Sequence, residues 1–332
     1  MSTAHSAADS AGTAHDGVRS SSAARRGFLL VALAAATWGT AGVSGSLVVA
    51  RTDLGPLDIA WYRMTIAAVA LFAGSVASRR RRPAVRPVLG RGVVVRLVLV
   101  AAGLAAYQLA FFAAVAKAGV SISTLVALGL APLLVAIGST VLGHGRPDGA
   151  TVAALVAALS GLILLVGISA GADAGTSVLL GALLAVGSAL GYAMVTLAGG
   201  GVPSGVPVTL IGFAGGGLLL TPVILVAGLH GTTDPTAIAL LLYLGVVPSA
   251  VAYVLFFTGL RSVPGPVVSI VTLIEPLTAT ALATAFLGER LSPGALAGGL
   301  LVLGAVAGLY LRRMGDSNSR GVAPNPLSKR AP

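Results

Sequence analysis

The stretch Lys117–Pro132, KAGVSISTLVALGLAP, resembles a second stretch of the same chain, Arg261–Pro276, RSVPGPVVSIVTLIEP. Each stretch begins with a cation and ends, fifteen residues later, with a proline that lies deep in an apolar run. Similarity between distant segments of one chain is the sequence signature of an internal structural repeat. The residues around the two stretches therefore decide whether the chain consists of two related halves.

The resemblance continues on both sides of these stretches, with an aromatic pair upstream and a glycine-containing loop downstream. The corresponding features are Tyr107 and Phe111 against Tyr253 and Phe257, and VLGHGRPDGA (141–150) against FLGERLSPGA (286–295). We predict two repeats, residues 27–170 and residues 171–313. The flanking tails, residues 1–26 and 314–332, are polar, and we expect both to be disordered and cytoplasmic.

The composition places both halves in a membrane. Of the 332 residues 56% are hydrophobic and only 9% are charged, whereas soluble domains carry about 25% charged residues. A helix that crosses the hydrocarbon core needs about 20 apolar residues. We therefore predict an all-α integral membrane protein with about ten transmembrane helices. The qualifying runs are 28–50, 56–78, 93–116, 120–142, 150–169, 177–199, 207–228, 236–258, 265–287 and 295–311.

The distribution of lysine and arginine predicts the orientation. With the N-terminus in the cytoplasm, sixteen of these residues fall in inside segments and three in outside segments, as the positive-inside rule requires. Both termini are then cytoplasmic, and we expect a multi-pass protein of the plasma membrane. Because each repeat has an odd number of spans, the second repeat enters from the opposite face. The two five-helix repeats are therefore predicted to be inverted.

Several classes of function are disfavoured by the composition. The net charge is +11, but the basic residues lie in loops and tails, so we expect membrane lipid and a small-molecule solute as partners and no nucleic acid. Cysteine is absent and the four histidines are scattered. We expect no metal and no cofactor, and the oligomeric state is left open.

Four short motifs stand in a fixed order along the chain. They are Ala36-Thr37-Trp38-Gly39, Gly55-Pro56 with Trp61-Tyr62-Arg63, Ile274-Glu275-Pro276, and Leu287-Gly288-Glu289-Arg290-Leu291. Their order and spacing resemble those of the EamA family of the drug/metabolite transporter superfamily. This resemblance covers about residues 27–313 and implies a ten-helix exporter or importer of small metabolites that works by alternating access. One departure is Gly143-His144-Gly145-Arg146, where the family usually has glycine–glutamate–arginine.

Two ionisable residues lie clearly inside predicted spans, Glu275 and Arg63. Such groups cost about 2.5–3.5 kcal/mol on insertion scales and require a reason. Glu275 either binds substrate or exchanges a proton in a central cavity, or it is a structural acid that pairs with Arg63 or caps backbone donors freed nearby. Arg63 either contacts a substrate anion or serves as a structural counter-ion. Because the corresponding place in the first repeat is Ala131, the acid breaks the pseudo-symmetry, which favours a functional role.

Prolines at matching positions predict breaks in two helices. Pro276 and Pro132 have no N–H group and weaken the hydrogen-bond ladder of the preceding turn. A broken helix beside a carboxylate is a common element of transporter sites at mid-depth. We therefore expect helix breaks at both prolines.

Other polar or aromatic residues inside spans are candidates for the lining of a cavity. As lining they would stack on a substrate or bond to it; as packing residues they would need only a nearby carbonyl group. Together with Arg63 and Glu275, the predicted substrate-binding residues are Trp38, Tyr107, Gln108, Tyr192 and Tyr253.

These observations predict a secondary transporter of a neutral, amphipathic or zwitterionic metabolite rather than an enzyme. The phosphate-binding motif G-x-x-x-x-G-K-[ST] does not occur, so the chain does not hydrolyse ATP itself. We expect export, with Glu275 as the candidate for proton coupling. The alternatives are a channel or a non-transporting membrane scaffold, and, less favoured, an intramembrane enzyme.

Overall fold

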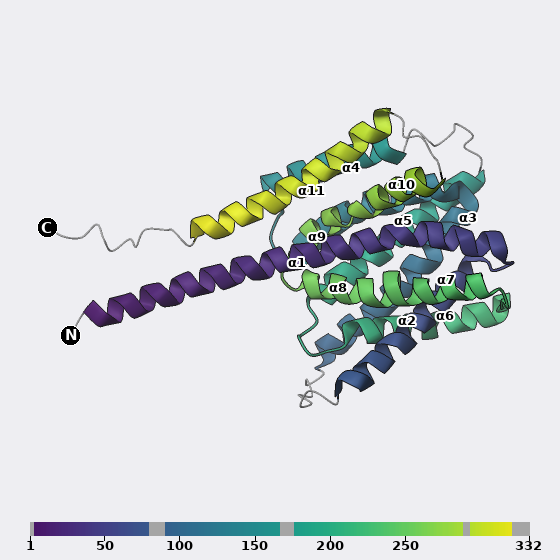
Figure 1. The fold of residues 1–332 in the computed structure, drawn as a ribbon, viewed down its shortest axis with the longest axis horizontal. Helices are drawn as coiled ribbons and strands as arrows, with labels where there is room; N and C mark the ends of the chain where they lie inside the picture. The colour runs from purple at the N-terminus through teal and green to yellow at the C-terminus, as the bar shows by residue number, and fades with distance from the viewer. Residues whose placement is uncertain (1–2, 80–89, 167–175, 288–292, 321–332) are drawn as a thin grey trace.

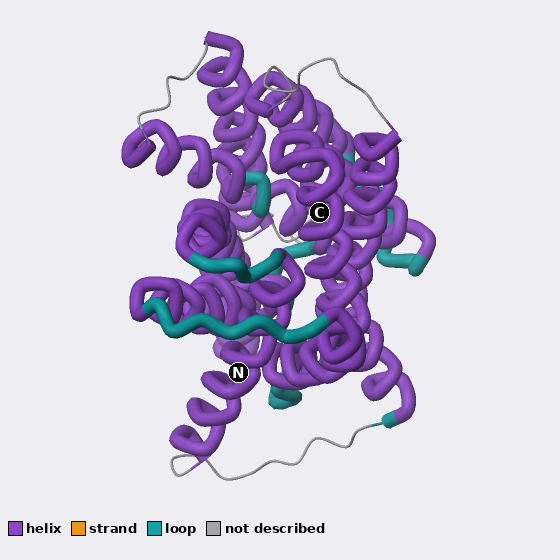
Figure 2. Tube along the Cα trace, turned by 90° about the vertical axis from the view of Figure 1, so that its right-hand side faces the viewer, coloured by secondary structure: helices purple, strands orange, loops and turns teal. Residues whose placement is uncertain are grey.

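The computed structural model describes residues 3–79, 90–166, 176–287 and 293–320, and in these ranges the ordered elements are helices joined by short loops (Figure 2). The helices are α1 (Thr3–Arg51), α2 (Pro56–Arg79), α3 (Arg91–Val141), α4 (Gly149–Val166), α5 (Thr176–Gly200), α6 (Val208–Ala227), α7 (Pro235–Gly245), the π-helix η2 (Val246–Val251), α8 (Ala252–Leu260), α9 (Gly265–Val271), α10 (Ile274–Leu287) and α11 (Pro293–Arg320).

Parts of the predicted tails lie outside the described residues. These parts are residues 1–2 and 321–332. Residues 288–291 of the last family-like motif also lie outside the described residues. The backbone is already helical from Thr3, so α1 begins well before the predicted first span at residue 28. The disorder of the tails stays a prediction.

Six helices of the described ranges are long and apolar enough to cross a membrane. Each coincides with one predicted span. Four shorter apolar helical segments, Val126–Val141, Gly149–Gly161, Gly265–Ala279 and Ala297–Leu309, overlap the remaining four. The helical membrane architecture is thus confirmed, whereas helix length alone does not establish a count of ten spans.

Helix α3 covers two predicted spans because it doubles back on itself, as its contacts with the straight run of α5 show. Gly103 of α3 faces Gly191 of α5, and Ala118 of α3 faces Gly181, ten residues nearer the start of α5. Farther along α3, Gly138 meets the side chain of Leu197 near the end of α5. The chain therefore runs along α5 in one direction, reverses after Ala118, and returns. The two predicted spans, 93–116 and 120–142, correspond to these two arms.

Two contacts set the direction of the helices around α1. Gly27 near the membrane-entering part of α1 packs against the backbone of Gly259 at the end of α8, so α1 and α8 are antiparallel. At the opposite end, Asp58 in the first turn of α2 bonds to His230, which follows α6. Helices α2 and α6, the second spans of their repeats, therefore also run in opposite directions, as an inverted repeat requires.

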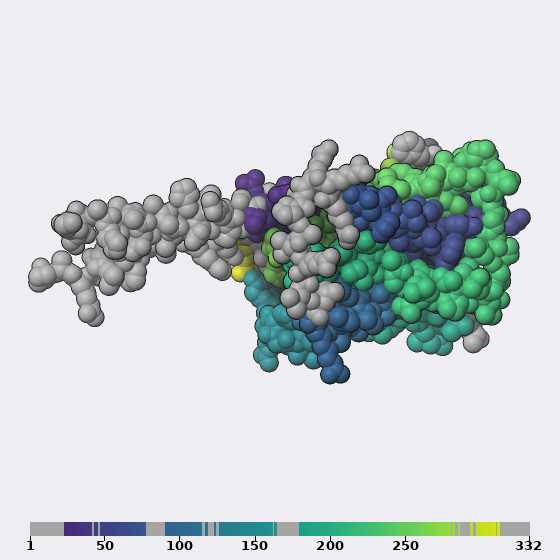
Figure 3. Space-filling model, turned by 90° about the horizontal axis from the view of Figure 1, so that it is seen from below, coloured from purple at the N-terminus to yellow at the C-terminus, as the bar shows by residue number. Residues whose placement is uncertain are grey.

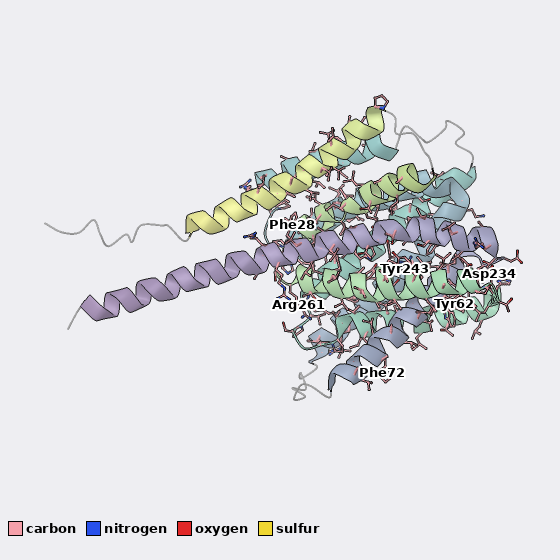
Figure 4. All side chains as sticks on the ribbon, viewed as in Figure 1. Phe28, Tyr62, Phe72, Asp234, Tyr243 and Arg261 are labelled. Atoms are coloured by element: carbon pink, nitrogen blue, oxygen red, sulfur yellow. The ribbon has the colours of Figure 1, made fainter. Side chains whose placement is uncertain are left out.

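Figure 4 shows the two ends of this bundle. Phe28 and Arg261 lie at the end from which the long N-terminal part of α1 projects, and Tyr62 and Asp234 lie at the other. In the space-filling view α2 lies between α7 and α6 on one face of the molecule (Figure 3). Helices α4 and α11 pack together to one side of the other helices (Figure 1). Helices of the second repeat pack against α1 and α2 of the first repeat. The centre of the bundle therefore lies between the two repeats.

The surface of the bundle is apolar, as a lipid environment requires. On α6 the side chains of Phe213, Leu220 and Ile224 are buried, while Leu218 and Val226 are 72% and 91% exposed. Exposed leucine and valine side chains of this kind occur on most of the long helices. Contiguous apolar surface of such extent is rare on soluble monomers, so the outward faces of these helices are suited to lipid tails.

The two predicted helix breaks have different outcomes. Helix α9 ends at Val271 and α10 begins at Ile274, so the helix is interrupted directly before Glu275 and Pro276. The structure corrects the prediction for Pro132, because α3 continues through it to Val141. Proline within a membrane helix is tolerated where neighbouring groups compensate for the lost backbone bond.

The space around a glycine predicts how much an alanine substitution there changes the stability of the protein. A side chain at Gly191 would lie 2.7 Å from the backbone nitrogen of Tyr107, whereas nothing lies within 4 Å at Gly304. Gly191→Ala should therefore destabilise the protein by about 1–3 kcal/mol through overpacking, and Gly304→Ala should be neutral or slightly stabilising. Thermal unfolding of both variants in the same detergent measures the difference. Equal stabilities would contradict the packing of α5 on α3.

Candidate functional site

An aromatic cluster lies where the two repeats meet. The ring of Trp38 on α1 lies 4.8 Å from that of Tyr253 and 5.4 Å from that of Phe256, both on α8. The Tyr253 ring is in turn 5.0 Å from Phe213 of α6, edge to face. Ring pairs at these distances stabilise one another beyond their burial. The cluster forms a rigid apolar wall built from both halves of the chain.

Gly39 brings α1 into direct contact with the helix that carries Glu275. A side chain at Gly39 would lie 2.6 Å from Cβ of Thr278 and 2.7 Å from the carbonyl oxygen of Glu275. Only glycine permits this approach. The two residues of the Trp38-Gly39 pair therefore have separate roles. Trp38 packs in the aromatic cluster, and Gly39 lets α1 pack closely against the first turn of α10.

Arg63 is buried in the bundle at 9% exposure, about a third of the way along α2. Its Nε donates a hydrogen bond of 3.3 Å to Oγ of Ser249 on the π-helix η2. No other polar partner of Arg63 is found in the described ranges. Of its three guanidinium nitrogens, one is therefore engaged and the two Nη atoms remain free of protein partners.

Glu275 lies in the first turn of α10, after the break that follows α9. Its side chain is half-buried and has no hydrogen bond or ion pair with any residue of the described chain. The carboxylate is near enough to interact electrostatically with Arg63, Tyr107 and Tyr253. Among the described residues, Arg312 instead pairs with Asp148, and His230 contacts Asp58 in a pair that is ionic only when the histidine is protonated. The two charges in the bundle interior are thus neighbours that do not touch.

Tyr107 and Tyr192 border the same region from α3 and α5, and their rings are 6.1 Å apart. The Tyr192 hydroxyl bonds to Oγ1 of Thr272 at 3.2 Å, and Thr272 lies in the break between α9 and α10. Tyr192 therefore attaches α5 to the segment that positions Glu275. The Tyr192 hydroxyl thus has a protein partner, whereas no hydrogen bond of the Tyr107 hydroxyl is found among the described residues.

Two further predicted residues have polar groups that the protein does not satisfy. Nε1 of Trp38 and Nε2 of Gln108 are buried without a hydrogen-bond partner in the described ranges. Trp38 is only 6% exposed and Gln108 only 2%. Leaving a buried donor unsatisfied costs about 1–3 kcal/mol. Such donors are expected where a ligand, rather than the protein, completes the hydrogen bonds.

Six of the seven predicted binding residues are thereby connected through rings or charges: Trp38, Arg63, Tyr107, Tyr192, Tyr253 and Glu275. Gln108 follows Tyr107 on α3, and no hydrogen bond from its side chain to the other six is found among the described residues. The described residues contain no group of three or more histidine, cysteine, aspartate or glutamate side chains that could hold a metal ion. The arrangement offers one anion, one cation and several donors beside an aromatic wall, which suits binding of an organic solute.

Sequence reasoning missed three residues that complete the site. Ser249 anchors Arg63, Thr272 anchors Tyr192, and Phe213 extends the aromatic cluster. Ser249 had a signal, because Pro248-Ser249 is a polar and helix-disrupting pair within an apolar run. Phe213 is indistinguishable by pattern from any other apolar residue of a span.

A second polar cluster closes the end of the bundle that carries Tyr62. The buried Asp58 carboxylate accepts bonds from the backbone N–H of Gly55 and of His230, at 2.8 and 3.1 Å, and lies 3.2 Å from Nδ1 of His230. Asp58 thereby joins the loop before α2 to the loop after α6. The structure thus places Asp58 in a joint between the repeats.

Comparison with known proteins agrees with this architecture. The chain is 30% identical over 283 residues to the uncharacterized transporter YwfM of Bacillus subtilis, covering 83% of this chain and 93% of that protein. It is 25% identical over 291 residues to the uncharacterized inner membrane transporter YicL of Salmonella typhimurium, covering 85% and 94%. A crystal structure with 21% identity superimposes with a TM-score of 0.71 over 87% of this chain and 98% of the other, which supports the fold.

The family comparison also reproduces the internal repeat. Residues 25–167 and, separately, residues 178–311 each match the same family, so the two halves predicted from the sequence are two copies of one unit. This match covers most of the chain and confirms the resemblance seen in the motifs. The chain belongs to the EamA-like transporter family.

Proposed function

We propose that this protein is a secondary transporter that exports a small zwitterionic solute across the plasma membrane by alternating access. Membership of a transporter family and a helical membrane architecture support transport as the general activity. The more specific parts of the proposal rest on the interior of the bundle. They concern the charge of the solute, the coupling to protons and the direction of transport.

The observation that carries the proposal is that Arg63 and Glu275 lie within electrostatic range of each other in the interior, while no ion pair between them is found among the described residues. Each charge costs about 2.5–3.5 kcal/mol at depth, and direct contact would offset part of that cost. Opposite charges that do not pair with each other can each pair with a charged group of a solute. A solute with a carboxylate for Arg63 and an ammonium group for Glu275 satisfies both.

The other groups of the site suit the remainder of such a solute. The orphaned donor of Trp38 can bond to an additional oxygen atom, and the rings of Trp38 and Tyr253 offer an apolar surface. A multiply charged solute would find no further charge among the site residues. A wholly apolar solute would leave both charges and the donor unsatisfied.

Glu275 is also the residue that we propose for proton coupling. Its carboxylate follows the break between α9 and α10, where the backbone geometry can change at small cost. It also lacks a protein partner that would hold it in one protonation state. Uptake of a proton would remove the charge that attracts the ammonium group, so protonation and solute binding would be antagonistic, as exchange of the two requires.

The proposed orientation has both termini in the cytoplasm and the repeats inverted. It rests on the excess of basic residues in the segments assigned to the inside and on the antiparallel relation of α2 and α6. The direction that we propose is export.

Transport measurements on single-charge variants test the proposed solute class. In proteoliposomes supplied with glycine, leucine or phenylalanine, wild type should move at least one of these zwitterions. Glu275→Gln should reduce that transport by about tenfold or more, the loss expected for one charge-assisted contact. Asp53→Asn, at an exposed acid outside the site, is the matched control. Unaltered transport by Glu275→Gln at every pH would remove Glu275 from the mechanism.

Arg63→Gln tests the other end of the solute in the same vesicles. Wild type should prefer each zwitterion to its methyl ester, because the ester lacks the carboxylate. The variant should lose this preference while it still recognises the ammonium group. An undiminished preference in Arg63→Gln would show that the carboxylate binds elsewhere.

Reporter fusions test the orientation. A fusion at residue 85 should report the cytoplasm, and one at residue 172 should report the exterior, because the predicted second span ends inside and the fifth ends outside. Both positions lie outside the described residues. The reverse pattern at the two positions would overturn the proposed topology.

A further inference from the structure

We propose that Ser249 fixes the guanidinium group of Arg63 so that its two Nη atoms form an end-on binding site for a carboxylate. This inference builds on the proposed function, since it names the group that receives the carboxylate of the solute. It assigns Ser249 as a positioning residue, which acts on the solute through Arg63. The argument begins with the helix that carries Ser249.

Pro248 creates the local geometry. In an α-helix the N–H group of residue 248 would bond to the carbonyl oxygen of Leu244, but proline has no N–H group. The helix widens here into the π-helix η2, between α7 and α8. Single turns of π-helix of this kind frequently occur at functional sites. The carbonyl oxygen of Leu244 is left to find another donor.

The hydroxyl group of Ser249 provides that donor. Ser249 Oγ donates to the carbonyl oxygen of Leu244 at 2.7 Å, and the side chain is fully buried. A serine hydroxyl has one proton and two lone pairs, so its proton is committed and only lone pairs remain. The oxygen therefore acts as an acceptor toward Nε of Arg63, at 3.3 Å. The direction of the contact is fixed by Arg63, whose guanidinium group has donors and no acceptor.

Engagement of Nε decides how Arg63 can bind an anion. A guanidinium group binds a carboxylate with two parallel bonds, either side-on through Nε and one Nη or end-on through both Nη atoms. With Nε held by Ser249, the end-on geometry remains. The plane of the fork is fixed as well, because rotation of the guanidinium group would break the bond to Ser249.

No polar group of the described residues bonds to the two Nη atoms of this fork. Arg63 forms no ion pair with Glu275, and no hydrogen bond of its Nη atoms is found among the described residues. Ser249 also breaks the symmetry of the repeats, since Gly103 holds the equivalent place, four residues before Tyr107 as Ser249 is before Tyr253. A scaffold feature should recur in both halves, whereas a substrate-facing device need not.

Binding of a simple carboxylate tests this inference without any transport step. The chain has two tryptophans, so Trp61→Phe leaves Trp38, beside Tyr253, as the fluorescent reporter of the site. Purified protein in this background is titrated with benzoate and with benzamide, its uncharged counterpart. Benzoate should bind more tightly than benzamide. Ser249→Ala should weaken benzoate by about tenfold and leave benzamide unaltered.

Three further variants make the result specific. In an Arg63→Gln background, Ser249→Ala should cause no additional loss, because Ser249 acts through Arg63. Ser249→Cys, nearly equal in size but a weak acceptor, should weaken benzoate in the same way if the alanine variant does not fold. Ser44→Ala removes a buried serine bonded to its own helix and should have no effect.

The outcomes separate this inference from the proposed function. Equal loss of benzoate and benzamide, an additive loss in the double variant, or wild-type protein that does not prefer benzoate would each overturn the inference. If benzoate binding behaves as expected while no zwitterion is transported, the carboxylate site stands and the proposed function fails. If zwitterions are transported while Ser249→Ala and Ser249→Cys bind benzoate normally, the proposed function stands and the role of Ser249 fails.

Discussion

The arrangement depends on two opposite charges, Arg63 and Glu275, that the fold holds near each other in its interior but apart. In an environment without water, a charge is stabilised by partners that the protein provides or by a ligand. Ser249 takes one nitrogen of Arg63, and the first turn of α10 presents Glu275 at a helix N-terminus, which favours a negative charge. These contacts support the charges without neutralising them. A solute can therefore still bond to the two Nη atoms of Arg63 and to the carboxylate of Glu275.

The helices around these charges are packed so that both repeats contribute to one site. Arg63 comes from the first repeat and Ser249 and Glu275 from the second, and Gly39 seats α1 directly against the backbone of Glu275. A relative movement of the repeats would change the distance between the two charges. Binding and movement are therefore linked by geometry, because a solute that bridges Arg63 and Glu275 bridges the repeats as well. This linkage is the physical requirement for alternating access.

Much of this arrangement was predictable from the sequence, for reasons that the structure makes clear. Apolar runs and their spacing define membrane helices because helix length must match bilayer thickness. Arg63 and Glu275 stood out because charges are rare in such runs, and Ala131 opposite Glu275 showed that the acid is not a scaffold feature. The helix break beside Glu275 followed from Pro276, and it is present between α9 and α10.

The missed features depend on three-dimensional contacts rather than on residue types. Pro132 and Pro276 occupy equivalent places, yet only the second accompanies a break, because the surroundings decide whether a lost backbone bond is tolerated. Gly191 and Gly304 are equivalent by pattern, but only Gly191 contacts another helix. The role of Ser249 depends on its contacts with Leu244 and with Arg63, and the contact with Arg63 joins residues that are far apart in the sequence. Pairing of Arg63 with Glu275 was left open by the sequence, and the structure keeps them apart.

The most direct test of the separated charges is an experimental structure in a lipid bilayer, determined with and without a transported zwitterion such as leucine. The account predicts that Arg63 and Glu275 form no ion pair in the free protein. In the complex, the carboxylate should lie across both Nη atoms of Arg63 and the ammonium group beside Glu275. A direct ion pair between Arg63 and Glu275 that persists in both structures, with the solute bound elsewhere, would contradict the account.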